Sequence, residues 1–462
     1  MRFGKRLLVA VMTVVVLGGA AIGVAKVKKP KVDPEDKTAW IRKQVVGGQA
    51  RNVILFVGDG MDESAITAAR NYWLGANGRF WMDRIRISGS ITTHATDELR
   101  LRDEPFYVTD SAASGSAWAT GRKTGLLRIS TAPMTGEALP TIAELAQQNG
   151  YRTGNVTTDS VTGATPAVQM AHVRMRNCES PADDSTCDAD AKSRGGLGSI
   201  AEQAADSKMD LIFGGGRSDF EKTITAGPDR GKTVLESAQR QGFDVVTDAA
   251  GLASYNGNKR LLGLFAGSGT TPDWSGQRAV SSGAKAQRCE TGKRPAEQPK
   301  LSEMTSKAIR ILNSRSKGKK KGFFLQVEGA DTDKGAHRAD PCWSMSGVGA
   351  LDEAVQVGLE FARKNPKTLL IVTADHGQSG QIVPFYGAGK SAVLTTNEGS
   401  PLIISYATGR KEEDDQEHSG IPVPLRAQGP QAANLMGLHD QTEIFDVILR
   451  ALNIKNPNKE NK

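Results

Sequence analysis

Short apolar runs that alternate with helical patterns limit the fold of this sequence more than any other feature. Five runs are apolar or β-branched and lead into glycine or an acidic residue: residues 52–57, 154–158, 211–213, 323–327 and 368–373. Between them, residues 64–72, 139–148 and 351–364 carry apolar side chains at helical spacing. Continuous apolar runs are typical of strands buried on both faces of a parallel sheet. We therefore predict an α/β fold, a three-layer sandwich in which helices flank a central, mostly parallel sheet.

The two ends of this pattern predict the domain organisation. Arg2, Lys5 and Arg6 precede an apolar run over residues 7–24, and small residues stand at Gly23 and Ala25. This layout predicts a signal peptide over residues 1–25. Because the run is long for a signal, an uncleaved N-terminal anchor is the alternative, and only then would the protein contact a membrane. Residues 26–45 are expected to form a flexible spacer and residues 46–455 one large domain, in which residues 245–300 are expected to be an insertion or an irregular lobe. Export predicts a periplasmic or secreted location.

The charge distribution and the cysteines indicate which partners and which covalent or metal links to expect. The formal net charge is +8, but the basic residues are scattered, and the densest run, residues 317–321, is typical of a solvated loop. We therefore expect no nucleic-acid partner. The four cysteines predict two disulfides in an exported chain, and three pairings can form. Cys178 with Cys187 closes a short polar loop, which leaves Cys289 with Cys342; no CxxC spacing supports a zinc site of cysteines.

Metal-type side chains follow three of the predicted strands. Asp59, Glu328, Asp375 and His376 stand at or just beyond their carboxyl ends, where such sheets bind ligands. Asp333 and His337 lie four residues apart, so one helical turn would place both on one face, which suits zinc. A single Asp after a strand is more often a cap or turn residue, and residues 328–337 alone are equally consistent with a surface turn.

Ser111 is the candidate nucleophile. It precedes a run of small residues that ends at Gly121, which predicts a helix with Ser111 at its N-terminus. Free backbone N–H groups and the helix dipole favour a phosphate or an alkoxide there. The alternative is that Asp110 or Ser111 serves only as a helix cap.

Several long motifs occur together and in order. They are VGDGMDESAITAARNY, YVTDSAASGSAWATGRKTG, ATPAVQMAHV, GFFLQVEGADTDKGAH, IVTADH and EEDDQEHSG. Over residues 52–452 the sequence resembles the alkaline phosphatase family, most closely its bacterial periplasmic branch, whose two-disulfide pattern the cysteines also match. The resemblance implies a homodimer with two zinc ions and one magnesium ion. It further implies that small phosphate monoesters are hydrolysed through a phosphoserine at Ser111.

The resemblance also assigns individual residues. Asp333, His337 and His418 resemble the ligands of the first zinc. Asp59, Asp375 and His376 resemble those of the second. Asp59, Thr165 and Glu328 resemble those of the magnesium site. Arg176 resembles the arginine that grips the substrate phosphate, and Lys334 a residue that links the phosphate to the magnesium site through water.

One position departs from the family pattern. Gly163 stands where the family has an aspartate that holds magnesium waters and pairs with the lysine. Lys334 then lacks its partner unless Asp331 or Asp159 replaces it. We predict altered magnesium dependence and altered phosphate release.

Two other classes of function fit the sequence less well. A phosphodiesterase or sulfatase of the same superfamily is the nearest rival, but residues 111–115 lack the Pro and Arg of the sulfatase pattern, and Arg176 disfavours a diesterase. A non-catalytic phosphate- or metal-binding protein would be expected to lack the nucleophile or the ligands. His94, His172 and His439 match no ligand position and are interpreted as structural.

Overall fold

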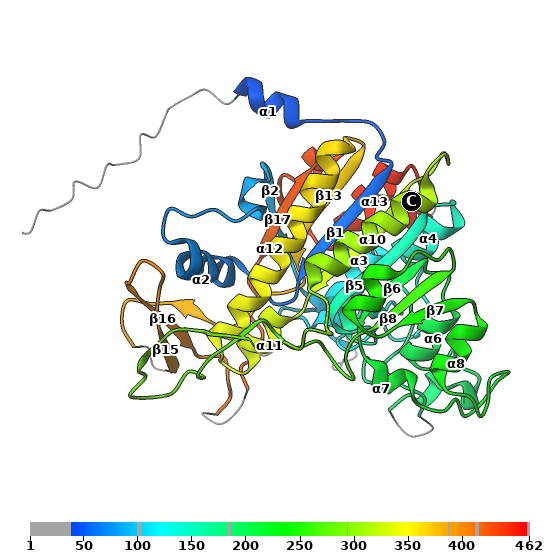
Figure 1. Ribbon diagram of the computed structural model, residues 1–462, viewed down its shortest axis with the longest axis horizontal. Coiled ribbons are helices and arrows are strands. Elements are labelled where there is room, and N and C mark those ends of the chain that lie inside the picture. Colours follow the sequence, from blue (N-terminus) through cyan, green and yellow to red (C-terminus); the bar gives the residue numbers. More distant parts are fainter. Residues whose placement is uncertain are drawn as a thin grey trace, which may run out of the picture. The chain divides into compact units, whose positions relative to one another are not determined.

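A ten-stranded sheet organises the described part of the chain, residues 38–98, 104–182, 186–292, 294–386, 389–411 and 415–459 of the computed structural model (Figure 1). Its strand order is β18-β2-β17-β13-β1-β12-β5-β6-β8-β7. Seven neighbours run parallel: β13 (Thr368–Ala374), β1 (Asn52–Gly58), β12 (Phe323–Gly329), β5 (Arg152–Ser160), β6 (Leu211–Gly215), β8 (Arg260–Leu264) and β7 (Phe243–Val246). At one edge, β17 (Val423–Gln428) runs antiparallel to β13 and to β2 (Ile87–Thr92), and β18 (Gly437–Asp440) runs parallel to β2.

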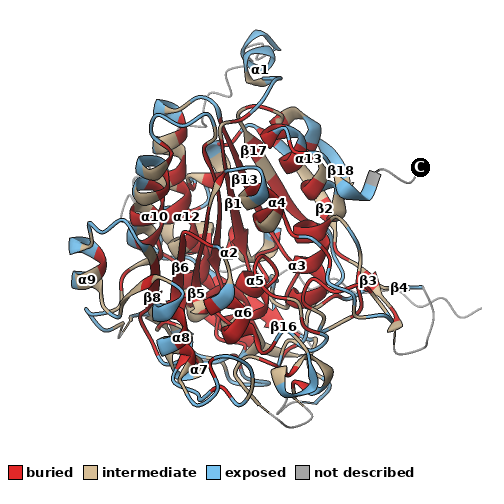
Figure 2. Cartoon of the chain, turned by 90° about the vertical axis from the view of Figure 1, so that its right-hand side faces the viewer, coloured by how far each residue is buried: buried red, intermediate tan, exposed pale blue. Residues whose placement is uncertain are grey.

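Helices cover both faces of this sheet. One layer contains α2 (Glu63–Leu74), α10 (Leu301–Ser316) and α12 (Pro341–Lys364). The other contains α3 (Ser111–Thr120), α4 (Ile142–Gln148), α5 (Ala164–Ala167) and α13 (Thr442–Leu452). Figure 2 shows the buried strands between the two layers. The predicted three-layer α/β sandwich is confirmed.

The core explains why the apolar runs became central strands. Every residue of β1, β12 and β13 is buried, as expected for strands covered on both faces. Trp118 of α3 is fully buried, and its Nε1 donates to Gln326 Oε1 of β12 at 3.2 Å. This bond fixes α3, which carries Ser111, against the centre of the sheet.

Short elements complete the chain. A second sheet contains β10 (Ala286–Gln287), β15 (Lys390–Thr395), β16 (Pro401–Tyr406) and β14 (Gln381–Ile382). β9 (Trp274–Ser275) pairs with β11 (Glu290–Thr291), and β3 (Ala95–Thr96) pairs with β4 (Pro105–Phe106). The remaining helices are α1 (Thr38–Gln44), α6 (Ile200–Asp206), α7 (Arg217–Phe220), α8 (Val234–Arg240), α9 (Ala249–Ser254) and α11 (Asp331–His337).

The structure describes parts of two of the predicted segments. The irregular lobe expected over residues 245–300 begins inside the central sheet, because β7 and β8 complete its edge. The spacer expected over residues 26–45 ends in helix α1, while residues 26–37 and the predicted signal peptide lie outside the described residues. Across the described part of the chain, no helix is long and apolar enough to cross a membrane.

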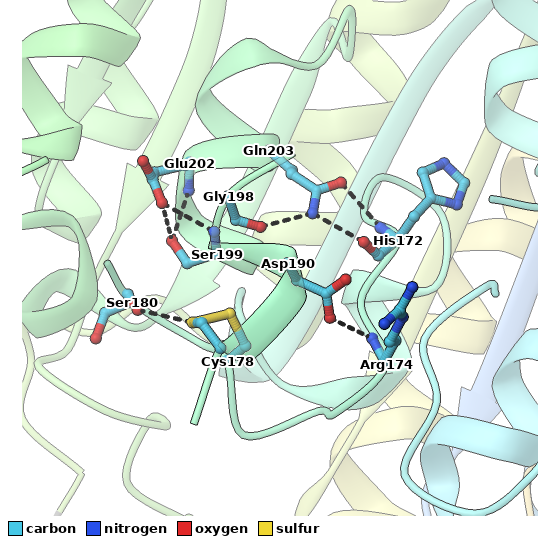
Figure 3. The surroundings of a disulfide bond; sticks show 10 residues. His172, Arg174, Cys178, Ser180, Asp190, Gly198, Ser199, Glu202 and Gln203 are labelled. Atoms are coloured by element: carbon cyan, nitrogen blue, oxygen red, sulfur yellow. Dashed lines mark hydrogen bonds between the residues drawn. A yellow bond between two sulfur atoms is a disulfide. The ribbon is translucent and has the colours of Figure 1, made fainter. Parts of the chain in front are cut away.

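Both expected disulfides are present. Cys178 bonds to Cys187 and Cys289 bonds to Cys342, so the suggested pairing is confirmed. Figure 3 shows the first bond, in a loop held by a donor–acceptor pair between Arg174 N and Asp190 Oδ2 at 2.6 Å. The disulfide therefore sits in an anchored loop that starts directly after Arg176.

Candidate metal centre and nucleophile

The carboxyl ends of two central strands, β1 and β13, bring together one group of buried donors. Asp59 follows β1, and Asp375 and His376 follow β13, which pairs directly with β1. His376 Nε2 lies 3.1 Å from Asp375 Oδ2 and 3.4 Å from Asp59 Oδ1. Gly60 N donates to Asp375 Oδ1 at 2.9 Å and locks the two strand ends together. One carboxylate oxygen from each aspartate and one imidazole nitrogen thus face a common point.

Helix α11 and a distant loop supply an adjacent group. Asp333 and His337 share one face of α11, with Asp333 Oδ2 at 3.2 Å from His337 Nε2. His418 Nε2 lies 3.5 Å from Asp333 Oδ1 and 3.1 Å from His337 Nε2. The His418 ring also stacks on His376 with ring centroids 3.6 Å apart, and Asp333, His376 and His418 themselves form a compact donor set. The two groups are therefore contiguous.

The histidine hydrogen bonds favour metal binding. Nδ1 of His337 faces Gln416 O, Nδ1 of His418 faces Thr109 O at 2.8 Å, and Nδ1 of His376 faces Gly377 O at 3.3 Å. A carbonyl oxygen only accepts, so each Nδ1 carries its hydrogen toward the backbone. A bound metal would take the Nε2 lone pair of each ring, which is the arrangement that orients imidazole ligands of metals.

The raised pKa values of two buried carboxyl groups also favour a bound cation. Burial, followed by repulsion from Asp375, Asp333 and Glu328, raises the pKa of Asp59 well above its ordinary value. Burial and the nearby Asp159 raise the pKa of Glu328 to about 8. Buried carboxylates this close to one another repel unless positive charge lies between them. A bound cation would supply that charge.

Buried oxygen atoms without a hydrogen-bond partner give an independent test of whether these residues fit a cation. Among the described residues, Asp59 Oδ1, Asp375 Oδ2 and Thr165 Oγ1 are buried and have no hydrogen-bond partner. Thr165 stands at the start of α5, next to Glu328, and its hydroxyl lowers the pKa of that carboxyl. Leaving a buried oxygen unsatisfied costs about 1–3 kcal/mol, so these atoms fit an oxygen-liganded cation.

Ser111 lies beside this cluster at the first position of α3. Its Oγ is 3.2 Å from His376 Nε2, and the residue is 3% exposed. Asp110 caps the helix by accepting from Ala113 N at 3.1 Å, and Gly121 ends the helix in the left-handed conformation at φ 73°. Because Asp110 takes the Ala113 N–H, the first-turn backbone N–H groups left for a ligand beside the Ser111 hydroxyl are those of Ser111 and Ala112.

Asp110 has a second contact that the sequence did not indicate. Its Oδ2 accepts from Arg176 Nη1 at 3.2 Å, while its Oδ1 also accepts from Leu127 N at 3.2 Å. The Arg176 backbone is held in turn, because its N–H donates to Leu127 O at 2.7 Å. One carboxylate thus couples the cap of the nucleophile helix to the guanidinium. The sequence showed only a capping residue, because the partner lies in another loop.

Lys334 has a partner, and that partner is Asp159. Lys334 Nζ forms an ion pair with Asp159 Oδ1 at the carboxyl end of β5. A Cβ at Gly163 would lie 2.7 Å from Asp159 Oδ2, and a Cβ at Gly269 would lie 2.9 Å from Lys334 Nζ. Two glycines therefore make room for the pair. Asp331 is engaged elsewhere, accepting from Trp343 Nε1 at 2.9 Å.

Glu179 is a residue that sequence reasoning missed. Burial, then Asp219 and Asp159, raise its pKa to about 7, and Arg176 and Lys334 oppose that rise. Its position in the disulfide loop after Arg176 was the only available signal. By contrast, His172 contacts Glu144 and His439 contacts Glu443, away from the cluster.

The sequence is similar to that of known proteins over most of its length. The family model for alkaline phosphatase matches residues 50–415. Streptomycin-6-phosphate phosphatase of Streptomyces griseus is 46% identical over 88% of this chain and 91% of its own length. Alkaline phosphatase of Escherichia coli K12 is 43% identical over 91% of this chain and 90% of its own.

Solved structures agree with these sequence matches. Alkaline phosphatase from the Antarctic bacterium TAB5 has a TM-score of 0.65 and 25% identity, covering 88% of this chain and 99% of that one. The Thermus thermophilus enzyme has a TM-score of 0.66 at 22% identity, covering 91% and 95%, and supports the fold. The chain belongs to the alkaline phosphatase family.

Proposed function

We propose that this alkaline phosphatase hydrolyses phosphate monoesters in two steps through a phosphoserine at Ser111. In the first step Ser111 Oγ bonds to phosphorus and the bond from phosphorus to the alcohol oxygen breaks, which releases the alcohol. In the second step water breaks the phosphoserine ester and yields inorganic phosphate and free Ser111. The observation that carries the proposal is the position of Ser111, at a helix N-terminus and 3.2 Å from His376 Nε2.

The chain's own groups would hold the phosphoryl oxygens. The first-turn N–H groups of α3 and the planar fork of Arg176 present hydrogen-bond donors to a phosphate. Asp110 orients that fork through its contact with Arg176 Nη1. Because phosphoryl transfer needs mainly positioning and charge neutralisation, these donors act where charge develops.

Three cation sites are proposed. Asp333, His337 and His418 would hold one zinc ion, and Asp59, Asp375 and His376 a second. Asp59, Thr165 and Glu328 would hold magnesium, which prefers oxygen ligands. Bound there, the ions would activate the serine oxygen, stabilise the leaving oxygen and neutralise the phosphate. Lys334, held by Asp159, would add a positive charge beside the magnesium ligand Glu328.

A substitution test separates the nucleophile from its surroundings. Ser111→Ala should lower kcat by several orders of magnitude, because the attacking oxygen is lost. Ser114→Ala is the matched control: Ser114 is buried on the same helix, and within the described part of the chain its Oγ donates to Ser111 O, at 3.3 Å. The control should retain activity within about tenfold. Equal activity of the Ser111 variant and wild type would refute the phosphoserine route.

Substrate class is tested by a panel. A chromogenic monoester, the matching diester and a sulfate ester should be hydrolysed in strongly decreasing order. Streptomycin 6-phosphate belongs in the panel because a relative at 46% identity is named for it. Comparable turnover of the diester or the sulfate would favour the rival superfamily activities.

We also propose a homodimer that is exported to the periplasm or secreted. β18 is an edge strand with two strongly exposed apolar side chains nearby, Met436 at 52% and Leu438 at 66%. Such side chains are typical of a contact surface. Light scattering after size-exclusion chromatography tests the dimer, and N-terminal sequencing of exported protein tests removal of residues 1–25. A monomer at all concentrations would refute the first proposal.

A further inference from the structure

The edge of the central sheet opposite the metal centre is rich in cations. β13, β1 and β12 are neighbours and parallel, so their amino ends meet on one edge. The residues that lead into β12, 313–322, contain five basic side chains, and those that lead into β13, 361–367, contain three; neither segment contains an acid. The basic residues are Arg315, Lys317, Lys319, Lys320, Lys321, Arg363, Lys364 and Lys367.

Hydrogen bonds show that these segments form one surface. Arg51, directly before β1, donates from its backbone N to Lys367 O at 2.6 Å. Its Nη1 donates to Lys319 O at 2.8 Å. Both bonds use backbone carbonyls, so they leave the lysine ammonium groups free. We call the surface formed by Arg51, Lys317, Lys319, Lys320, Lys364 and Lys367 the cationic edge.

The cationic edge is exposed and its charges are uncompensated. All five lysines are exposed, and within the described ranges none forms an ion pair. Farther along the same sheet edge the pattern changes: Arg152 pairs with Asp210 at 3.2 Å, and Lys259 pairs with Asp244 at 3.3 Å. Asp210 also pairs with Arg315 of the segment that leads into β12, at 3.6 Å, so within the described ranges the charges without an acidic partner are those of the five exposed lysines.

The partner that fits is an extended anionic surface. The charges come from the segments before three strands, so they match a layer of anionic groups better than one small anion. Phe361 is the one aromatic residue in the two basic segments, and its ring packs against the buried Phe323 at 5.6 Å between ring centroids. Neither segment therefore offers an exposed ring for stacking on bases.

We propose that the cationic edge docks the enzyme on acidic phospholipid headgroups. β1 and β13 run downward in Figure 1, and the donors of the metal centre follow their carboxyl ends. Docking by the amino ends therefore turns the active site away from the lipid, toward dissolved substrates. The surface thereby fixes the orientation of the enzyme as well as its location.

Vesicle experiments with the exported protein test the proposal. Vesicles of phosphatidylcholine alone are compared with vesicles in which about one quarter of the lipid is phosphatidylglycerol. Anionic vesicles should slow amide exchange in residues 316–321 and 364–368, and neutral vesicles should not. The triple variant K317E/K319E/K320E should lose this protection, and its affinity for anionic vesicles should fall at least about tenfold.

A matched variant carries the same change of charge elsewhere. Lys222, Arg230 and Lys285 are exposed and lie outside the cationic edge, so K222E/R230E/K285E should bind anionic vesicles like wild type. Both variants should retain phosphatase activity, which reports that they fold and keeps this test independent of the proposed mechanism. If the two triple variants lose binding equally, or if neither does, the proposal fails. Tighter binding to duplex DNA than to anionic vesicles, with protection of the same residues, would instead assign the edge to nucleic acid and overturn it.

Discussion

Replacement of Asp159 by Asn should make the enzyme hold its product more tightly. The change keeps the shape of the side chain and removes the negative charge that faces Lys334 Nζ. Among the described residues no other carboxylate forms an ion pair with this ammonium group, and Asp331 already accepts from Trp343 Nε1. The net charge beside the phosphate site therefore rises by one.

The size of the effect follows from Coulomb's law. One unit charge at roughly 5 Å from another contributes about 3 kcal/mol at an effective dielectric constant near 20. The Lys334 side chain is 33% exposed and that of Asp159 is 19% exposed, so solvent screening reduces the figure. About 1–2 kcal/mol remains. We expect the inhibition constant for inorganic phosphate to fall about tenfold.

Product inhibition measures this directly. KM and the inhibition constant for phosphate should fall together, and kcat should fall if release of phosphate limits turnover. Asp219→Asn is the control, because Asp219 accepts from Thr162 Oγ1 and does not contact Lys334. An unchanged or weaker affinity for phosphate in the Asp159 variant would refute the reasoning.

The same geometry refines the expectation at Gly163. Its φ of −58° suits any residue, so only crowding matters. Because a Cβ there would lie 2.7 Å from Asp159 Oδ2, Gly163→Asp alone should lower activity. The double variant Asp159→Ala/Gly163→Asp should recover it and shift the magnesium titration. Failure of the double variant to recover would mean that the two positions are not interchangeable.

Three further results are expected. Chelation should lower the melting temperature, because buried carboxylates such as Asp59 lose their compensating charge, and calorimetry with and without added metal checks this. Asp110→Asn should raise KM about tenfold while unfolding free energy changes by less than about 1 kcal/mol, because Asn also caps helices but cannot pair with Arg176 as an anion. Burial lowers the pKa of His172 but Glu144 raises it above its ordinary value, and the pKa of Glu144 falls. The pair therefore stabilises the fold most between about pH 4.5 and 6.5 and less as pH rises, so Glu144→Gln should cost about 0.5–1 kcal/mol in that window in denaturant titrations and less above it.

The fold was predictable where strands are buried on both faces. The apolar runs now in β1, β12 and β13 carry a signal that does not depend on neighbours, because every side chain faces the core. β14, β15 and β16 were missed, since they are short or form a small separate sheet in which pairing decides the structure. The antiparallel edge formed by β17 and β2 was missed for the same reason.

Some residues of the candidate site could likewise be predicted from the local sequence, and others could not. Asp59, Glu328, Asp375 and His376 could be proposed from their places at strand ends. Thr165, Arg176 and His418 have no local pattern, and only the family resemblance assigned them. The pairing of Lys334 with Asp159 needed coordinates, because it depends on space left by glycines rather than on any sequence motif.

The order of the donors along the chain has a consequence for biosynthesis. His418 Nδ1 meets Thr109 O across 309 residues, and Asp59 stands near the start of the folded region. With His418 as a ligand, as proposed above, an incomplete chain that ends before it cannot assemble the full set of donors. The ions could then bind, and Ser111 could attack a substrate, only after the whole chain has been synthesised and folded. The enzyme would therefore be inactive during synthesis without a separate inhibitor.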